Sequence, residues 1–153
     1  MGKICVGRVI GGGLVAGLVI NICEFLVNGL WLAADWENAM RALGKPMATG
    51  ALPMVCYNIW GFAMGIMAVW LYAAIRPRFG PGSKTAYNAA IAVWIPGYLL
   101  ALVPPAIIGI FPLRLMLIGL AVGLVEVLIG AQLGAWIYKE ESAPSGVSAA
   151  AGV

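Results

Sequence analysis

Four long apolar runs, separated by short polar segments, dominate the hydropathy pattern of this chain. They cover residues 9–32, 54–75, 86–103 and 113–138. A helix needs about 20 apolar residues to cross a bilayer, and lipid offers no partners for an unpaired backbone. The pattern therefore predicts an all-α integral membrane protein, a bundle of four transmembrane helices forming a single domain over residues 1–139. We expect the small and polar residues 140–153 to be a disordered tail.

The first connection, residues 35–44, has the pattern of a short helix. Asp35 is a suitable N-cap, and Gly44 stands where a helix commonly ends. Trp36 begins an apolar face with Met40 and Leu43 at helical spacing. We expect this helix to lie on the outer leaflet as an interfacial helix or to continue the first span into water.

Prolines predict where the later helices bend and end. Pro96, followed by glycine, should kink the third helix because it removes one backbone donor. The adjacent Pro104 and Pro105 should end that helix. Pro112 is a good first residue for the fourth.

Basic residues are divided unequally between the two sides of the predicted bundle. Six lie at the termini or in the second connection, against three in the other two connections: Lys3, Arg8, Arg76, Arg78, Lys84 and Lys139 against Arg41, Lys45 and Arg114. This excess predicts that both termini are cytoplasmic. Arg76, Arg78 and Lys84 are expected to contact anionic lipid headgroups, at about 1 kcal/mol each.

Composition excludes several classes of function. Of 153 residues, 63% are hydrophobic and 10% are charged, which removes the chain from the water-soluble class. The net charge of +3 comes without a basic cluster, so we expect no nucleic-acid partner. The chain has no histidine, which excludes imidazole-bound haem, Ser-His catalysis and nearly every catalytic zinc site. We expect no cofactor, no metal site and no enzymatic activity, and we expect Cys5, Cys23 and Cys56 to be reduced and buried.

The first and fourth runs each carry one acid within a stripe of small residues. In the first run, Asn21, Glu24 and Asn28 continue a glycine face, and in the fourth run Glu126 interrupts one. Such faces let helix backbones approach closely. The helix-packing glycines predicted in this way, including two in the second run, are Gly13, Gly17, Gly61, Gly65, Gly119, Gly123, Gly130 and Gly134.

The two intramembrane acids are the candidate chemistry. Glu126 is near the middle of its run, and Glu24 is offset by about 5 Å at the helical rise, a difference that side chains bridge. An unpaired carboxylate at this depth costs about 2.5–3.5 kcal/mol or keeps its proton, and two adjacent acids favour sharing one. The polar residues expected around them are Asn21, Asn28, Asn58 and Tyr98. Two interpretations stay open: a proton-titrating or cation-binding site, or a protonated glutamate that only locks helices together.

One segment carries a family resemblance. Residues 69–82 read VWLYAAIRPRFGPG, followed by Lys84 and Thr85. This segment resembles a family of small bacterial four-span membrane proteins without an assigned activity. The resemblance implies a multi-pass protein of the bacterial inner membrane and supplies no chemistry. Size, span number and an acid in the first helix are also similar to small multidrug resistance transporters, whose pattern around the acid differs from that around Glu24.

Two functions from different classes follow as hypotheses. The first is a structural or accessory membrane protein that packs through its glycine faces, in a homo-oligomer or a larger membrane complex, with membrane lipids as its other partners. The alternative is a proton-coupled transporter of small or cationic molecules, in which Glu24 and Glu126 are the titrating pair.

Overall fold

The computed structural model describes residues 4–138, which form helices and connections without a β-strand. The predicted tail, Lys3 and Lys139 lie outside the described residues. The elements in chain order are α1 (Val6–Glu24), η1 (Phe25–Trp31), α2 (Ala33–Ala42), α3 (Ala51–Phe79), α4 (Ser83–Trp94), η2 (Ile95–Leu100), α5 (Ala101–Ile107) and α6 (Leu113–Ile137). The elements η1 and η2 are π-helical.

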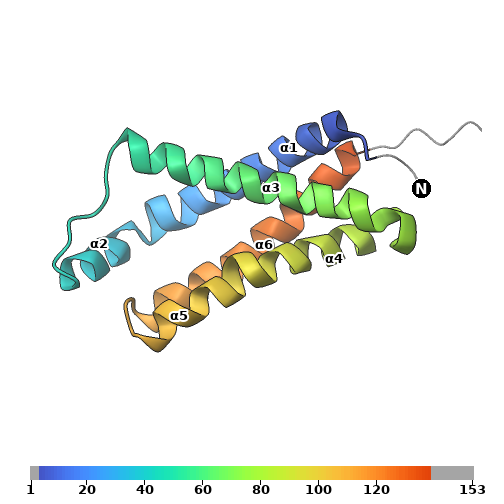
Figure 1. Ribbon diagram of the computed structural model, residues 1–153. Coiled ribbons are helices and arrows are strands. Elements are labelled where there is room, and N and C mark those ends of the chain that lie inside the picture. The colour runs from blue at the N-terminus through green and yellow to red at the C-terminus, as the bar shows by residue number, and fades with distance from the viewer. Residues whose placement is uncertain (1–3, 139–153) are drawn as a thin grey trace, which may run out of the picture.

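Four helical units are long and apolar enough to cross a membrane, which confirms the four predicted spans. They cover Val6–Trp31, Ala51–Phe79, Ser83–Ile107 and Leu113–Ile137. Three of them are longer than the hydropathy pattern indicates, most of all the second and third, because helix continues into the flanking residues at both ends of those two runs. Consecutive spans run in opposite directions, and Figure 1 shows α1 and α4 on different sides of α3 and α6.

Glycines bring the backbone of α1 into direct contact with that of α3. A Cβ atom placed on Gly13 would lie 2.5 Å from the Cα of Ile66, and one on Gly17 would lie 2.6 Å from the Cα of Phe62. A Cβ atom on Gly65 would overlap the backbone nitrogen of Gly17. A methyl group at any of these positions requires the two helices to move apart.

The contact between α1 and α6 has the same character. A Cβ atom on Gly130 would lie 2.9 Å from the carbonyl oxygen of Ala16, and one on Gly134 would lie 2.8 Å from the carbonyl oxygen of Gly12. The helix α1 therefore lies in backbone contact with two neighbours at once.

Gly119 does not pack, so this part of the glycine prediction is wrong. A Cβ atom placed there would meet nothing within 4 Å among the described residues. At this level α6 meets the residues that follow the first span through larger side chains, in a cluster of Leu32, Leu115 and Ala39 flanked by Ile118. Side chains of this size keep the two backbones apart, which leaves open space beside Gly119.

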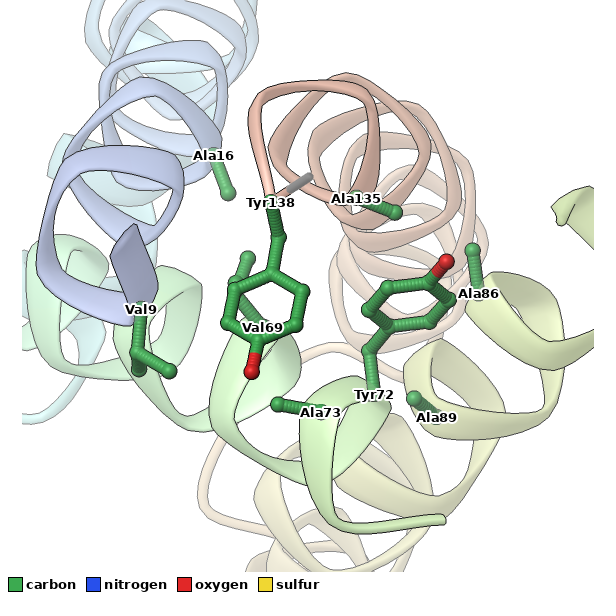
Figure 2. Close-up of a cluster of buried hydrophobic side chains, with 9 residues drawn as sticks. All are labelled: Val9, Ala16, Val69, Tyr72, Ala73, Ala86, Ala89, Ala135 and Tyr138. Atoms are coloured by element: carbon green, nitrogen blue, oxygen red, sulfur yellow. The ribbon is translucent and has the colours of Figure 1, made fainter. Parts of the chain in front are cut away.

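A cluster of mostly small side chains closes the end of the bundle at which α1 begins and α6 ends. We call this the terminal end. Figure 2 shows the rings of Tyr72 and Tyr138 among valine and alanine side chains from α1, α3, α4 and α6. The two rings meet edge to face, with their centres 6.1 Å apart. The hydroxyl of Tyr138 also accepts a hydrogen bond from the backbone N–H of Cys5 at 3.4 Å, which ties the start of α1 to the end of α6.

The turn from α3 to α4 also lies at the terminal end and contains only residues 80–82. Gly80 and Gly82 have φ angles of +81° and +120°, which side-chain-bearing residues rarely adopt. The hydroxyl of Thr85 donates to the Gly80 carbonyl at 2.7 Å, and the N–H of Gly82 donates to the hydroxyl of Tyr72 at 3.3 Å. The turn is therefore fixed by side chains from both helices that it joins.

The predicted end of the third helix is wrong. Helix α5 continues through Pro104 and Pro105 to Ile107. Pro96 lies in the π-helical turn η2, and such local adjustments keep a helix hydrogen-bonded where proline lacks a donor. The chain therefore accommodates these prolines within one spanning unit.

The short helix α2 exists, but its predicted N-cap is wrong. It begins at Ala33 with Leu32 as the N-cap, because Leu32 is 1% exposed in a hydrophobic cluster and the helix restarts directly after it. Asp35 faces Arg114 of α6 instead, at 3.9 Å. Gly44, with a φ of +69°, follows the last turn as the sequence indicates. In Figure 1, α2 continues beyond α1 in much the same direction.

The cysteines are unpaired as predicted, but the prediction that all three are buried is wrong. Cys5 and Cys56 are exposed on the surface of the bundle, and Cys23 is half-buried. Cys5 precedes the first residue of α1, and Cys23 and Cys56 lie on helices that pack against their neighbours mainly through glycine and alanine.

The backbone contacts predict a sharp difference between two glycine substitutions. Gly65→Ala should destabilise the bundle by about 1–3 kcal/mol, as expected for overpacking, because the new methyl group meets the backbone of α1. Gly119→Ala, the matched control on α6, should leave stability unchanged or raise it slightly. Thermal unfolding in a mild detergent measures both, and equal stabilities for the two variants would contradict this packing.

Candidate functional site

Glu126 is the most enclosed acid in the described chain, with 0% of its surface exposed. It lies midway along α6, on the face that also carries Gly123 and Gly130. These glycines bring neighbouring groups close to the acid: the ring of Tyr98 covers Gly123, and the backbone of Ala16 lies against Gly130. The same small residues that pack the helices therefore exclude other side chains from around Glu126.

One oxygen of Glu126 accepts a hydrogen bond from a fixed donor, and the other has no donor among the described residues. The hydroxyl of Tyr98 donates to Oε1 at 2.5 Å, whereas Oε2 has no hydrogen-bond partner among residues 4–138. Tyr98 is held in place on two sides, by Gly123 of α6 and by the ring of Trp60 of α3, whose centre is 5.4 Å away. The donor that Tyr98 supplies is consequently well positioned.

Glu24 faces Glu126 from α1. The two carboxyl groups are close enough to share a hydrogen bond. Both would be acceptors if both were ionised, so a contact between them requires a proton or another cation. The structure thus brings together the two acids that the sequence places on the first and last spans.

A chain of hydrogen bonds extends from Glu24 toward α2. The side-chain amide of Asn28 donates to Oε2 of Glu24 at 2.5 Å. The indole N–H of Trp36 donates in turn to Oδ1 of Asn28 at 2.9 Å. The acid pair is therefore linked to a helix that begins after the first span has ended.

Both π-helical turns lie at this site. The turn η1 begins directly after Glu24, and η2 contains Tyr98. Such turns are rare and occur frequently at functional sites. Pro96 accounts for η2, but η1 contains no proline, and its backbone closes with a bond from the Leu32 N–H to the Val27 carbonyl at 2.8 Å. Two spans thus depart from regular helix next to the acids.

The remaining asparagine candidates do not join the site. The side-chain amide of Asn21 donates to the backbone oxygen of Asn58 at 3.2 Å, which ties α1 to α3. The amide of Asn58 donates to the Met54 carbonyl on its own helix at 2.8 Å. Of the six predicted polar candidates, the structure gathers Glu24, Glu126, Asn28 and Tyr98.

Two residues near the acids were not predicted from the sequence. Trp36 lies eight residues after Asn28, beyond the break at Leu32. The sequence pattern places it on an apolar face and gives no indication that its indole N–H acts as a hydrogen-bond donor here. Cys23 lies near enough to interact electrostatically with both acids. A search for donors that could complete the hydrogen bonding of Asn28 would have found Trp36.

The three basic candidates lie at the terminal end, remote in the fold from the acids. Arg76 lies over the ring of Tyr138 at 6.0 Å and Arg78 over that of Phe79 at 5.9 Å, while Lys84 is exposed. None of the basic residues in the described chain is among the groups that act on Glu126. The acid pair therefore has no counter-ion in this part of the protein.

The described residues contain no cluster of the side chains that usually bind metal ions. No group of three or more histidine, cysteine, aspartate or glutamate side chains within residues 4–138 is placed to hold a metal ion. The site offers two carboxyl groups, one hydroxyl and one amide.

Comparisons with protein-family models, with curated proteins and with solved structures find no match for this chain. The resemblance of residues 69–82 to small bacterial four-span proteins therefore stays an expectation, and the geometry of the site carries the functional argument.

The contact between Tyr98 and Glu126 predicts a cost for removing one hydroxyl group. Tyr98→Phe keeps the ring between Gly123 and Trp60 but leaves Oε1 of Glu126 without its donor, which should destabilise the protein by about 1–3 kcal/mol. Tyr57→Phe is the matched control, since Tyr57 is 72% exposed. Thermal unfolding in mild detergent tests this, and a Tyr98→Phe protein as stable as the control would show that the hydroxyl contributes nothing.

Proposed function

We propose that this protein is a proton-coupled transporter of small or cationic molecules, in which the Glu24–Glu126 pair takes up and releases the proton. The observation that carries the proposal is the enclosed carboxyl of Glu126, which faces a second acid and has one oxygen without a hydrogen-bond donor among the described residues. Acids inside a spanning bundle are costly, and the default interpretation of such a group is functional.

A purely structural role accounts less well for this arrangement. A buried acid that serves only packing is expected to have a donor for each oxygen, whereas Oε2 of Glu126 has no donor among the described residues and depends on a proton shared with Glu24. Two acids in contact are also poorly suited to holding two helices together, because the carboxylates repel each other as soon as the shared proton is lost. A glutamine at either position would hold the helices together without that liability.

The packing suggests how binding at the pair could move the helices. Toward the terminal end, α1 and α6 are in backbone contact at Gly12 and Gly134. Toward the α2 end, α6 instead meets the start of α2 through larger side chains such as Leu115 against Leu32. Repulsion between two ionised carboxylates should therefore separate the helices at the α2 end first, and a cationic molecule could enter in place of the proton.

Membrane and orientation belong to the same proposal. The structure places the start of α1, the α3–α4 turn and the end of α6 at one end of the bundle. The excess of basic residues at that end favours the cytoplasmic side. The acid pair would then be reached from the outside of a bacterial inner membrane through the α2 end, with Arg76, Arg78 and Lys84 at the inner headgroups.

A structural or accessory role in an assembly is the second candidate. It is favoured by the low burial of the third span, since only 11% of its apolar stretch is buried within the chain. Most of this span is therefore available for contact with another protein. The glycine faces are occupied inside one chain, so a homo-oligomer or larger complex would have to use other surfaces. One such surface is the groove between α4 and α6, where Tyr87 lies beside Gln132 and the Gln132 side-chain oxygen is unpartnered among the described residues.

The transporter proposal predicts that both acids are needed for proton exchange. In reconstituted vesicles, adding a lipophilic cation such as tetraphenylphosphonium should release protons from the wild-type protein. Glu24→Gln and Glu126→Gln should abolish this release while the helical content and stability are kept, because glutamine keeps the shape but cannot lose a proton. Glu37→Gln, at an exposed position in α2, is the matched control. A pH-sensitive dye outside the vesicles measures the release.

The assembly role predicts a different result. In that case both glutamine variants would behave like the wild-type protein, and a partner or a second copy would leave the membrane with this chain in mild detergent. Proton release that persists in Glu126→Gln would overturn the transporter proposal.

A further inference from the structure

We infer that Trp36 sets the ion selectivity of the acid pair: it holds the Asn28 amide with its N–H groups toward Glu24, so that the pair accepts a proton and rejects alkali-metal cations. This inference rests on the proposed function and deepens it. In this role Trp36 is a positioning residue, because it touches Asn28 and acts on the carboxyls through it.

The orientation of Asn28 follows from the chemistry of indole. The Trp36 ring nitrogen carries a hydrogen and can only donate, so it must face the oxygen of the Asn28 amide. The Asn28 amide has one oxygen and one nitrogen, so the group that faces Glu24 is the NH₂. Trp36 thereby excludes the flipped amide, which would aim an oxygen at the acid.

Trp36 is itself held by the connection before α6, and residues beside it in the chain are held by α6. Its ring meets that of Phe111 edge to face, with the centres 5.4 Å apart. Leu32, one turn earlier, is buried against Leu115. Asp35, next to Trp36, lies 3.9 Å from Arg114. The indole consequently has little freedom to turn away from Asn28.

The neighbours of the acid pair offer hydrogens rather than lone pairs. Asn28 and Tyr98 both donate to the carboxyl groups. Sodium and other hard cations are bound by several oxygen lone pairs, including neutral ones from amide oxygens. In the described hydrogen bonds of the pair with Asn28 and Tyr98, every acceptor is a carboxyl oxygen. A single proton on one carboxyl satisfies this arrangement, since it leaves the other acid as its acceptor.

The titratable groups facing the pair come from three elements. Helix α1 contributes Cys23 beside Glu24, the π-helical turn η2 contributes Tyr98, and α6 contributes Glu126 itself. The α3 residue beside Tyr98 is the uncharged Trp60. Within the described chain, no basic group is among those that act on these residues, so selectivity depends on the orientation of the neutral donors.

The test compares proton binding in sodium chloride and in choline chloride. The carbonyl stretch of a protonated carboxylic acid is followed by infrared difference spectroscopy of the purified protein in mild detergent as the pH is changed. The band is assigned to the pair by its loss in Glu126→Gln. In the wild-type protein, the midpoint of this titration should be the same in both salts.

Trp36→Phe keeps the ring against Phe111 but frees Asn28 to turn its oxygen toward the acids. Excess sodium should then compete with the proton and lower its apparent affinity about tenfold, which moves the midpoint down by about one pH unit. Trp31→Phe is the matched control, because Trp31 is a nearby tryptophan that is exposed at the end of η1. Asn28→Asp tests the idea independently of Trp36 packing, since it keeps an acceptor for the indole while replacing the amino group by oxygen, and it should also become sodium-sensitive.

The outcomes separate the inference from the function on which it rests. A wild-type midpoint that moves with sodium as much as those of the variants overturns the inference and leaves the transporter proposal standing. Midpoints in Trp36→Phe and Asn28→Asp that ignore sodium overturn the role of Trp36. A wild-type protein without a band that depends on Glu126 overturns the proposed function itself.

Discussion

The direct contact of helix backbones at glycine is the constraint on which the rest of this structure depends. In lipid, apolar side chains gain little by leaving one apolar environment for another, so helices associate mainly through close packing and polar contacts. The helix α1 uses Gly13 and Gly17 against α3, and it uses Ala16 against Gly130 of α6. These contacts fix the height and rotation of α1, and so they determine that Glu24 meets Glu126 rather than lipid.

The bundle has two kinds of packing along its length. At the terminal end, alanine and valine surround two tyrosine rings, and the helices beside them are in backbone contact at glycine. Toward the α2 end, leucines and aromatic rings fill wider spaces, and regular helix gives way to η1 and η2. The acid pair lies where these two regions join. A site at such a junction has rigid support on one side and adjustable elements on the other.

Hydropathy and helical periodicity were sufficient for the spans and for the facing acids, because both depend on composition along one helix face. They were insufficient wherever the outcome depends on a neighbouring element. Asn21 and Asn28 share a stripe, yet only Asn28 reaches the acids, since the close approach of α3 gives Asn21 a backbone partner first. The position of Leu32 as an N-cap and the open space at Gly119 both follow from the cluster that contains Leu32 and Leu115. No local sequence pattern predicts that cluster. Trp36 was missed for the same reason, as its partner lies across a helix break.

The two acids belong to the first and the last spans of the chain, and this has a consequence for biogenesis. Synthesis proceeds from the N-terminus, so Glu24 leaves the ribosome about a hundred residues before Glu126. During that interval the first helix holds a carboxyl group without its eventual neighbour, and it must enter the bilayer carrying a proton or wait beside the insertion machinery. Arrival of α6 brings Glu126 to Glu24, so the acid pair forms only when the last span has been made.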